Sequence, residues 1–286
     1  LSKLAILRPG FIRLAIIRGR QAGHDRMRPI SLHCFGIGDG WPCGDRSHSS
    51  FLYRFGQVNL LIDCGEPVSR HFKNTGLKYD AIDRIFISHL HCDHISGFFM
   101  LMQGFWLEKR RKDLPVHLPA DGIAPVRQML NAAYIFDELL AFRLQFQPLE
   151  TGRSVITEDV RVTPFPTTHL EGLRRAFQED HPQSFAAYSF LLESDPVRIA
   201  HSADLGAVDD LAPLVEKPLD LLVCELAHFK PKDLFLYLQG REIKRIVFIH
   251  VSRRHWEALP KTEVLARKLL GNIPFSFARD GENITL

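Results

Sequence analysis

The chain has 286 residues, 45% of them hydrophobic, and its 36 basic and 33 acidic side chains leave a net charge of +3. This near balance lacks the basic excess of dedicated nucleic-acid-binding proteins, although a local basic patch is compatible with it. Five scattered cysteines without a CxxC pair argue against a disulfide framework and a zinc knuckle, and they favour a reducing, cytoplasmic setting. No run of about 18 apolar residues indicates a membrane span, so no membrane partner is expected.

Residues 1–28 are expected to be an extension of no fold significance. They are rich in arginine and contain one acidic residue, Asp25, which is also the composition of targeting peptides and of helices that lie on membranes. Pro9-Gly10 would interrupt such a helix. Since the first convincing strand begins just after Met27, we expect the natural start there and a single domain over residues 29–286.

Short runs of β-branched and aromatic residues alternate, from residue 30 onward, with turn residues and with segments of helical periodicity. The first half opens on a hairpin, in which a Gly56-Gln57 turn joins two apolar runs. The strands expected in chain order are 30–36, 51–55, 58–63, 84–88, 115–118, 159–164, 185–193, 197–201, 220–224, 245–250 and 275–278.

Helices are expected to follow the strands in each half. Asp121-Gly122 and Pro260 are the start signals of two of them. The expected helices are 66–76, 95–111, 122–134, 208–216, 231–241 and 260–271. Two strand-rich halves, each followed by helices, predict one α/β domain in which two packed sheets carry helices on their outer faces.

The segment Ile85–His94, IFISHLHCDH, leads from a buried-type strand into four potential metal ligands within six residues. Alternation along an extended chain places His89 and His91 on one side, and the turn into the next helix brings Asp93 and His94 to a second position. Imidazoles and carboxylates bind zinc and similar divalent ions, and catalytic sites keep one position open for water. A polar surface turn is the alternative, but it explains this density poorly. The sequence therefore predicts two adjacent metal sites.

HLHCDH matches the H-x-H-x-D-H signature of the metallo-β-lactamase superfamily, which the chain resembles over about residues 30–286. The later order agrees as well, because His169, Asp204 and His250 each follow an apolar run. The resemblance implies a four-layer αββα sandwich with two divalent metal ions, zinc being expected and manganese or iron the alternatives. It implies one metal on His89, His91 and His169, the other on Asp93, His94 and His250, and Asp204 between them.

Single histidines after strands are more often structural than functional, so the agreement in order carries this assignment. Four other histidines have no counterpart in the family and are expected to be structural: His33, His71, His117 and His201.

Within the superfamily, the likeness is greatest to ribonuclease Z and its relatives that lack the tRNA-binding arm. The Gly-rich stretch 35–50, the strand end at 61–66, the lead 82–88 and the closing motif 250–254 all resemble theirs. In those enzymes the arm is commonly inserted between the third His and the bridging Asp. This chain has room there only for a short loop and one strand pair. The resemblance therefore implies a phosphodiesterase for a small phosphodiester, a nucleotide or a nucleic-acid end.

A further histidine of those enzymes is thought to protonate the leaving group, and His228 has its spacing here. Glu225 is retained in the motif before it, which is otherwise altered to Cys-Glu-Leu-Ala. Two metals would make an activated water available near neutral pH, oriented by Asp93 or Asp204. Protonated His228, held by Glu225, would then assist the departing alkoxide.

Several other motifs allow a functional or a structural interpretation. Arg253 and Arg254, next to His250, are candidates for binding a substrate phosphate. The basic run 110–112 is expected to be a solvated helix end, and the aromatic run 98–106 to be core rather than a base-stacking surface. The glycines of 36–40 are expected to serve backbone geometry rather than phosphate binding.

Two other classes of function compete with the phosphodiesterase. The same site could hydrolyse a non-phosphate ester, lactone, thioester or lactam. A redox diiron protein is disfavoured, since such members usually have Glu at the position of His91. An inactive binding protein of the same fold would usually have lost ligands, and all seven are present here. A homodimer is suggested by analogy alone.

Overall fold

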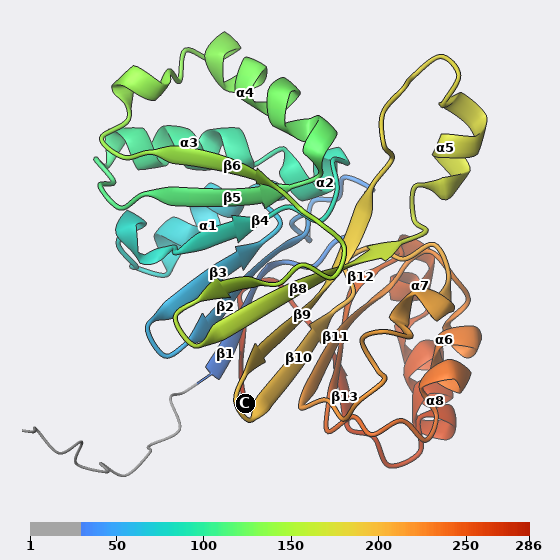
Figure 1. Cartoon of the computed structure of the whole chain (residues 1–286). Coiled ribbons are helices and arrows are strands. Elements are labelled where there is room, and N and C mark those ends of the chain that lie inside the picture. The colour runs from blue at the N-terminus through green and yellow to red at the C-terminus, as the bar shows by residue number, and fades with distance from the viewer. Residues whose placement is uncertain (1–29) are drawn as a thin grey trace, which may run out of the picture.

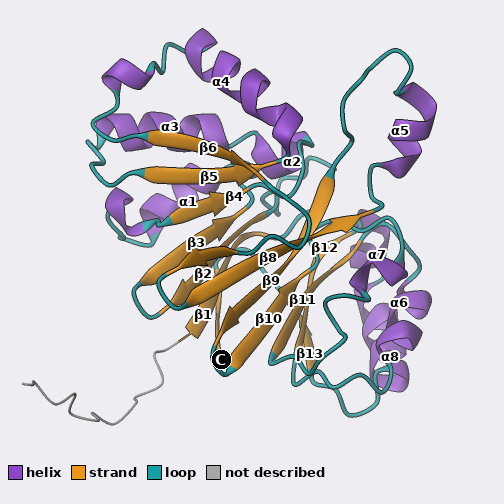
Figure 2. Cartoon of the chain, viewed as in Figure 1, coloured by secondary structure: helices purple, strands orange, loops and turns teal. Residues whose placement is uncertain are grey.

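The computed structural model describes residues 30–286, so the prediction that residues 1–28 are an extension lies outside the described residues. Two seven-stranded sheets face each other and carry helices on their outer faces, as the cartoons show (Figure 1, Figure 2). The predicted αββα sandwich is therefore confirmed. Within residues 30–286, no helix combines the length and apolarity that crossing a membrane requires.

The two sheets are built from successive halves of the chain, except that the last strand returns to the first sheet. In spatial order, the first sheet consists of β14 (Glu282–Thr285), β1 (Ile30–Gly36), β2 (Ser50–Phe55), β3 (Val58–Ile62), β4 (Arg84–Phe86), β5 (Leu114–Leu118) and β6 (Leu144–Pro148). The second consists of β13 (Phe275–Phe277), β12 (Ile246–Val251), β11 (Leu221–Leu226), β10 (Val197–His201), β9 (Ala187–Ser194), β8 (Val160–Thr167) and β7 (Val155–Thr157).

Helices cover the sheets from outside, with α1, α3 and α4 over the first sheet and α6 and α8 over the second (Figure 1). The helices are α1 (Val68–Asn74), α2 (Cys92–Ile95), α3 (Phe98–Leu107), α4 (Ile123–Ala132), α5 (Glu171–Phe177), α6 (Pro231–Leu238), α7 (Arg253–Glu257) and α8 (Leu259–Leu269).

Three apolar clusters fill the three spaces between the four layers. Successive strand side chains point to opposite faces, so a strand buried on both faces supplies two clusters. In β3, Leu60 and Ile62 join the cluster between the sheets, whereas Leu61 joins the one beneath the helices of the first half. In β12, Val247 faces the other sheet and Phe248 faces the outer helices. Because these strands are buried on both faces, their sequences are continuous apolar runs rather than alternating patterns.

Each half combines antiparallel and parallel pairing. The predicted hairpin is present, since β2 pairs antiparallel with β3 and Phe55 lies opposite Val58 across the turn. Strands β3 to β6 and β10 to β13 then run parallel to their neighbours. Parallel pairing brings the carboxyl ends of successive strands to one edge, which is where ligands bind in open α/β sheets.

All eleven predicted strands are present, with ends that differ by a few residues. Three strands were not predicted: β6, β7 and β14. β7 has three residues and β14 has four, which is too short for a clear period, and β6 ends on a proline that the pattern treats as a break.

The predicted helix 208–216 is wrong. The chain forms a short 3₁₀ helix, Val208–Leu211, and then turns. Pro213 explains the difference, because proline lacks the N–H that a helix interior needs and disfavours helical geometry at the residue before it.

The predicted helix 95–111 is present as the shorter α3, Phe98–Leu107; a separate short helix, α2, ends at Ile95, and Ser96-Gly97 lies between the two. A Cβ at Gly97 would lie 2.7 Å from the carbonyl oxygen of Gly65, so the chain approaches another backbone segment at this break. The aromatic run within α3 contributes Phe98 and Phe105 to the core, as predicted.

The prediction that the basic run 110–112 is a solvated helix end is wrong for Arg110. Its side chain is 1% exposed. The guanidinium donates to the backbone carbonyls of Tyr79, Ile82, Lys112 and Asp113. Burial lowers the pKa of Arg110 to about 10, although neighbouring aspartates oppose that change. This arginine therefore satisfies the carbonyls of the loops beneath α3.

The segment between β8 and β9 is more than a short loop. It contains α5, which has no buried residue, and residues 172–184 are all exposed. Figure 1 shows α5 standing away from the sandwich. The end of the segment is attached to the first half, because the Asp121 carboxylate accepts hydrogen bonds from the backbone N–H and the hydroxyl of Ser184, both at 2.8 Å. The segment thus spans from the second sheet to the loop after β5.

Candidate metal centre

Strand ends position the residues of the candidate metal centre. His89 and His91 follow β4, and α2 then carries Asp93 and His94. The remaining histidines and aspartate come from the second sheet: His169 follows β8, Asp204 follows β10, and His250 lies in β12. The site therefore lies where both sheets end, and neither half of the chain contains it alone.

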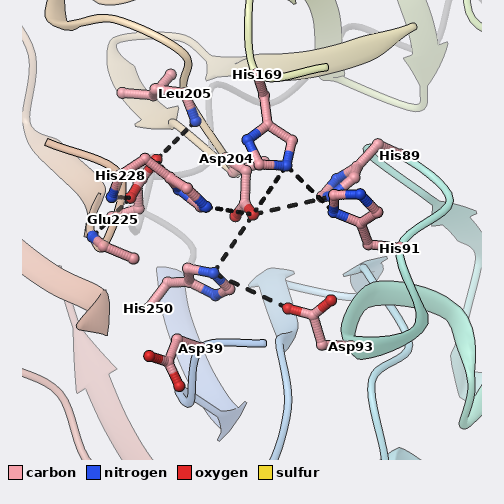
Figure 3. A network of polar contacts seen from close by, with 12 residues as sticks. Asp39, His89, His91, Asp93, His169, Asp204, Leu205, Glu225, His228 and His250 are labelled. Atoms are coloured by element: carbon pink, nitrogen blue, oxygen red, sulfur yellow. Dashed lines mark hydrogen bonds and ion pairs between the residues drawn. The ribbon is translucent and has the colours of Figure 1, made fainter. Parts of the chain in front are cut away.

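The structure brings all seven predicted ligands together in two groups that share Asp204. Within each group, one ligand atom per residue lies within 4.8 Å of all the others. Figure 3 shows the side chains converging from opposite sides on the Asp204 carboxylate. The first group is His89, His91, His169 and Asp204, and the second is Asp93, His94, Asp204 and His250. This is the division that the resemblance implied.

Asp204 occupies the middle of the site. Its Oδ1 lies 3.3 Å from Nε2 of His94, and its Oδ2 lies 3.3 Å from Nε2 of His250 and 3.6 Å from Nε2 of His169. Burial alone would raise the pKa of Asp204, but the surrounding histidines hold it well below the usual range. The geometry suits a carboxylate that bridges two cations.

Three polar atoms of the site are buried and have no hydrogen-bond partner among residues 30–286: Nε2 of His89, Nε2 of His94 and Oδ1 of Asp204. Leaving such atoms unpaired costs about 1–3 kcal/mol each. All are metal-ligand atoms, and imidazole with carboxylate is a donor set for zinc and similar ions. The residues therefore fit divalent metal ions.

A shell of hydrogen bonds that the sequence did not predict orients the histidines. The Asp63 carboxylate accepts from Nδ1 of His94 at 2.7 Å and from the backbone N–H and hydroxyl of Ser88. The hydroxyl of Ser49 lies 3.0 Å from Nδ1 of His250. Such contacts fix which ring nitrogen faces a metal. Asp63 follows β3 directly, a position at which a strand-end carboxylate could have been noticed from the sequence.

Close backbone contacts place Asp93. A Cβ at Gly65 would lie 2.3 Å from the carbonyl oxygen of Asp93, and one at Gly36 would lie 1.9 Å from the carbonyl oxygen of His48. Neither contact has room for a larger residue. For Gly36, this supports the prediction that the glycines of 36–40 serve backbone geometry.

Glu225 and His228 lie beside the two groups, as the resemblance to ribonuclease Z implied. Nδ1 of His228 is 2.8 Å from Oε1 of Glu225, and Nε2 is 3.8 Å from Oδ2 of Asp204. Glu225 also accepts from the backbone N–H groups of Leu205, Ala227 and His228, which leaves it little capacity for a metal. Burial lowers the pKa of His228, but the hydrogen bond and charge of Glu225 outweigh it and raise the pKa to about 9.

The two predicted phosphate-binding arginines lie at the start of α7. Both are exposed, and the guanidinium of Arg253 lies 3.1 Å from Oε1 of Glu257. The backbone N–H of Arg253 donates to Asp39, whose carboxylate lies near His250 in Figure 3. Their role in binding substrate stays a prediction.

The four histidines assigned to structure all contact other residues of the fold, and His33 does so through a ring contact with Phe35. His71 bonds the hydroxyl of Ser47, His117 stacks on Phe86, and His201 bonds the hydroxyl of Tyr53 in the core. None of the four belongs to a potential metal-binding group among the described residues.

Residues 58–251 match the β-lactamase superfamily domain, and this stretch contains every predicted ligand. The chain belongs to the metallo-β-lactamase superfamily. Its similarity to ribonuclease Z is also clear: the enzyme of Azobacteroides pseudotrichonymphae is 33% identical over 265 residues, which cover 80% of this chain and 90% of that protein. This member of the superfamily is thus ribonuclease Z-like.

Other relatives match over a shorter range. The ribonuclease Z of Bacteroides fragilis is 32% identical over 146 residues, 50% of this chain and 47% of that protein. The chain thus spans about half the length of such relatives.

Solved structures of the superfamily share the fold at low sequence identity. The short form of human tRNase Z superposes with a TM-score of 0.67 and 19% identity, covering 89% of this chain and 98% of that one. A diphosphatase of the PhnP family superposes with a TM-score of 0.64 and 15% identity, covering 89% and 97%.

Proposed function

We propose that this protein is a dinuclear metal-dependent phosphodiesterase. The observation that carries the proposal is the pair of His/Asp groups that share Asp204, with His228 beside them and bonded to Glu225. The names of its relatives, ribonuclease Z and a diphosphatase, support phosphorus chemistry over the alternative ester and lactam substrates. Retention of all seven candidate ligands argues against an inactive binding protein.

The metals would supply an activated water and positive charge for the phosphoryl oxygens. Asp204 would take part in holding both metals, because its carboxylate lies close to His94 and His250 of one group and to His169 of the other. Asp93, which lies at the edge of the second group and is partly exposed, would orient the water by accepting a hydrogen bond.

His228 would donate the proton to the leaving oxygen. Its Nδ1–H is held by Glu225, so Nε2 points toward Asp204. The side chain is 33% exposed, so the ring can exchange protons with solvent while it faces the reacting groups. Glu225 would act as a positioning residue, because the same carboxylate also bonds the N–H of Leu205 next to Asp204.

A small phosphodiester, a nucleotide or a nucleic-acid end is the substrate class that we propose. The relatives named ribonuclease Z support a nucleic-acid substrate. The segment 168–186 between β8 and β9 contains a single seven-residue helix, α5, and this favours a small substrate or a chain end over a grip on a folded RNA. Zinc is the proposed metal, since the five histidines of the set suit it. A homodimer and a cytoplasmic location stay predictions.

The first test combines metal analysis with hydrolysis of bis(p-nitrophenyl) phosphate by the wild type and by Asp93→Ala. We expect two metals per chain and phosphodiesterase activity, with a loss of at least a hundredfold in the variant. Asp180→Ala, an exposed carboxylate on the segment after α5, is the matched control and should retain full activity.

Each other outcome would change the proposal. Two bound metals without phosphodiesterase activity would replace the phosphodiester by another ester, a lactone, a thioester or a lactam. A chain that binds no metal would remove the catalytic interpretation.

A further inference from the structure

A polar cavity lies where the chain crosses from the first sheet to the second. Its volume is about 470 Å³, within the range of small-molecule sites. The wall comes from β4, β5 and β6 on one side and from β7 and β8 on the other. Its polar side chains are Arg84, His117, Gln147, Glu150, Arg153 and Ser154. No candidate metal ligand lines it.

Arg84, the first residue of β4, carries a partly buried charge without a directly bonded acid. Its guanidinium donates to the hydroxyl of Thr157, to Nε2 of His117 at 3.2 Å and to the carbonyl of Ile156 at 3.4 Å. All three acceptors are neutral. Burial lowers the pKa of Arg84, and only the charge of Asp83 opposes this.

Asp83 does not neutralise this guanidinium directly. Its carboxylate is engaged by the Lys112 ammonium and by the backbone N–H of Asn59. Among residues 30–286, Arg84 forms no salt bridge, whereas the partly buried Arg198 is bonded to Glu193. A buried cation without an acid is costly, so an anion entering the cavity would be favoured.

His117 adds no negative charge to the wall. It accepts from Arg84 through Nε2 and stacks on Phe86, with ring centroids 4.8 Å apart. Because Nε2 accepts a hydrogen bond, the neutral ring carries its proton on Nδ1. Burial and the charge of Arg84 lower the pKa of His117 to about 4, so the ring is neutral at physiological pH.

Arg153 supplies a second cation at the rim. It pairs with Glu150, and the side chains are 73% and 50% exposed. A pair this exposed contributes at most about 1 kcal/mol, so Arg153 can turn from Glu150 toward a ligand at small cost. With two arginines against one glutamate, the wall keeps a net positive charge.

We propose that this cavity binds a small phosphomonoester. A guanidinium offers paired donors that match phosphate oxygens, and two arginines match the charge of a phosphomonoester better than that of a single carboxylate. Gln147 and Ser154 offer further polar contacts to a sugar or similar group. The site is separate from the metal centre, since Arg84 and His89 are five residues apart along a largely extended segment, on the order of 15 Å.

The test measures binding of ribose 5-phosphate to the full metal-loaded protein by isothermal titration calorimetry, with ribose and acetate as comparison ligands. We expect ribose 5-phosphate to bind and the comparison ligands not to bind. Arg84→Gln and Arg153→Ala should each weaken binding at least tenfold. Arg143→Ala is the matched control, because Arg143 is an equally exposed arginine paired with an acid outside the cavity, and it should bind as the wild type does.

Hydrolysis of bis(p-nitrophenyl) phosphate should be unchanged in all three variants, since none of these residues belongs to the metal centre. Arg153→Ala replaces an exposed side chain and keeps the test valid if Arg84→Gln fails to fold. Equal affinity in the wild type and in Arg153→Ala, or binding that disappears when the metals are chelated, would overturn the proposal. Calorimetry measures binding and requires no hydrolysis. A lack of ribose 5-phosphate binding can therefore be distinguished from a lack of phosphodiesterase activity.

Discussion

The carboxylate of Glu225 accepts four hydrogen bonds, two of them from His228. A buried carboxylate with this many donors fixes the imidazole ring and stabilises its protonated form. His228 can therefore act as an acid only in the orientation that directs Nε2 toward Asp204. The resemblance to ribonuclease Z implied the pair, whereas the contact from Glu225 to Leu205 is visible only in the structure.

At the scale of this residue, we predict that His228→Ala slows the hydrolysis of phosphodiesters to a degree that depends on their leaving group. Alkyl esters need a proton on the departing oxygen and should lose about 10²–10⁴-fold in kcat. Activated p-nitrophenyl esters need none and should lose less than tenfold. Asp93→Ala should slow both classes alike. A His228→Ala variant that slows both ester types equally would refute the role of His228 as the acid.

The residue types in the sequence indicate which side chains could bind a metal, but they do not indicate which side chains hydrogen-bond to those ligands. His89 to His94 are close in the sequence and could be found from their spacing alone. Asp63 and Ser49 support His94 and His250, which are 31 and 201 residues further along the chain. Contacts over such separations arise only when the sheets assemble, so no local pattern reveals them.

Among the elements, the segment that carries α5 departs most from the sequence prediction. Its helix buries nothing, and two apolar side chains, Leu173 and Phe177, are 42% and 49% exposed. Helices this short are marginal without packing. The attachment of Ser184 to Asp121 therefore limits the motion of the segment, because it ties one end to the first half of the fold.

At the scale of this element, we predict that Asp121→Ala loosens the segment without unfolding the protein. Losing two hydrogen bonds to a carboxylate at a partly exposed site costs about 1–2 kcal/mol of local stability. Trypsin cleavage after the exposed Arg174 or Arg175 should become about fivefold faster or more. Glu179→Ala, on the same segment and away from this attachment, is the control. Unchanged cleavage in Asp121→Ala would show that the attachment does not hold the segment.

The ends of the helices could be predicted only in part from local sequence patterns. Pro213 was present in the sequence, and its effect on helix 208–216 could have been predicted from its missing N–H. The break at Gly97 could not be predicted, since it depends on the close approach of Gly65, which follows β3 in the chain. Periodicity identifies helices and strands, whereas the exact ends depend on neighbours in space.

For the whole molecule, the site joins the two halves of the sandwich. The first half supplies His89, His91, Asp93 and His94, and the second supplies His169, Asp204 and His250. Metals bound to the folded state therefore stabilise the contact between the sheets. When the free metal concentration is 100 times the Kd, one bound metal adds about 2.7 kcal/mol to the free energy of unfolding.

At this scale, we predict that chelation lowers the thermal midpoint. Two metals at that saturation contribute about 5 kcal/mol, which corresponds to a fall of roughly 10 °C or more for a chain of this size. Calorimetry before and after EDTA, with zinc added back, measures the change. Asp204→Asn should reduce the response to zinc, because it weakens both groups. An unchanged midpoint after complete removal of the metals would contradict the prediction.

The sequence by itself determined the two-half α/β organisation and the four ligands of the HLHCDH motif, because apolar periodicity and this motif are local properties of the chain. The resemblance to the metallo-β-lactamase superfamily added His169, Asp204 and His250, since their order along the chain matches that of the family. Only the tertiary structure decided that Arg110 is buried, that Asp63 orients His94, and that α5 stands clear of the sandwich. It also brought Arg84, His117 and Arg153 to one cavity. These features depend on contacts between segments that lie far apart in the chain, and such contacts exist only once the two sheets have packed together.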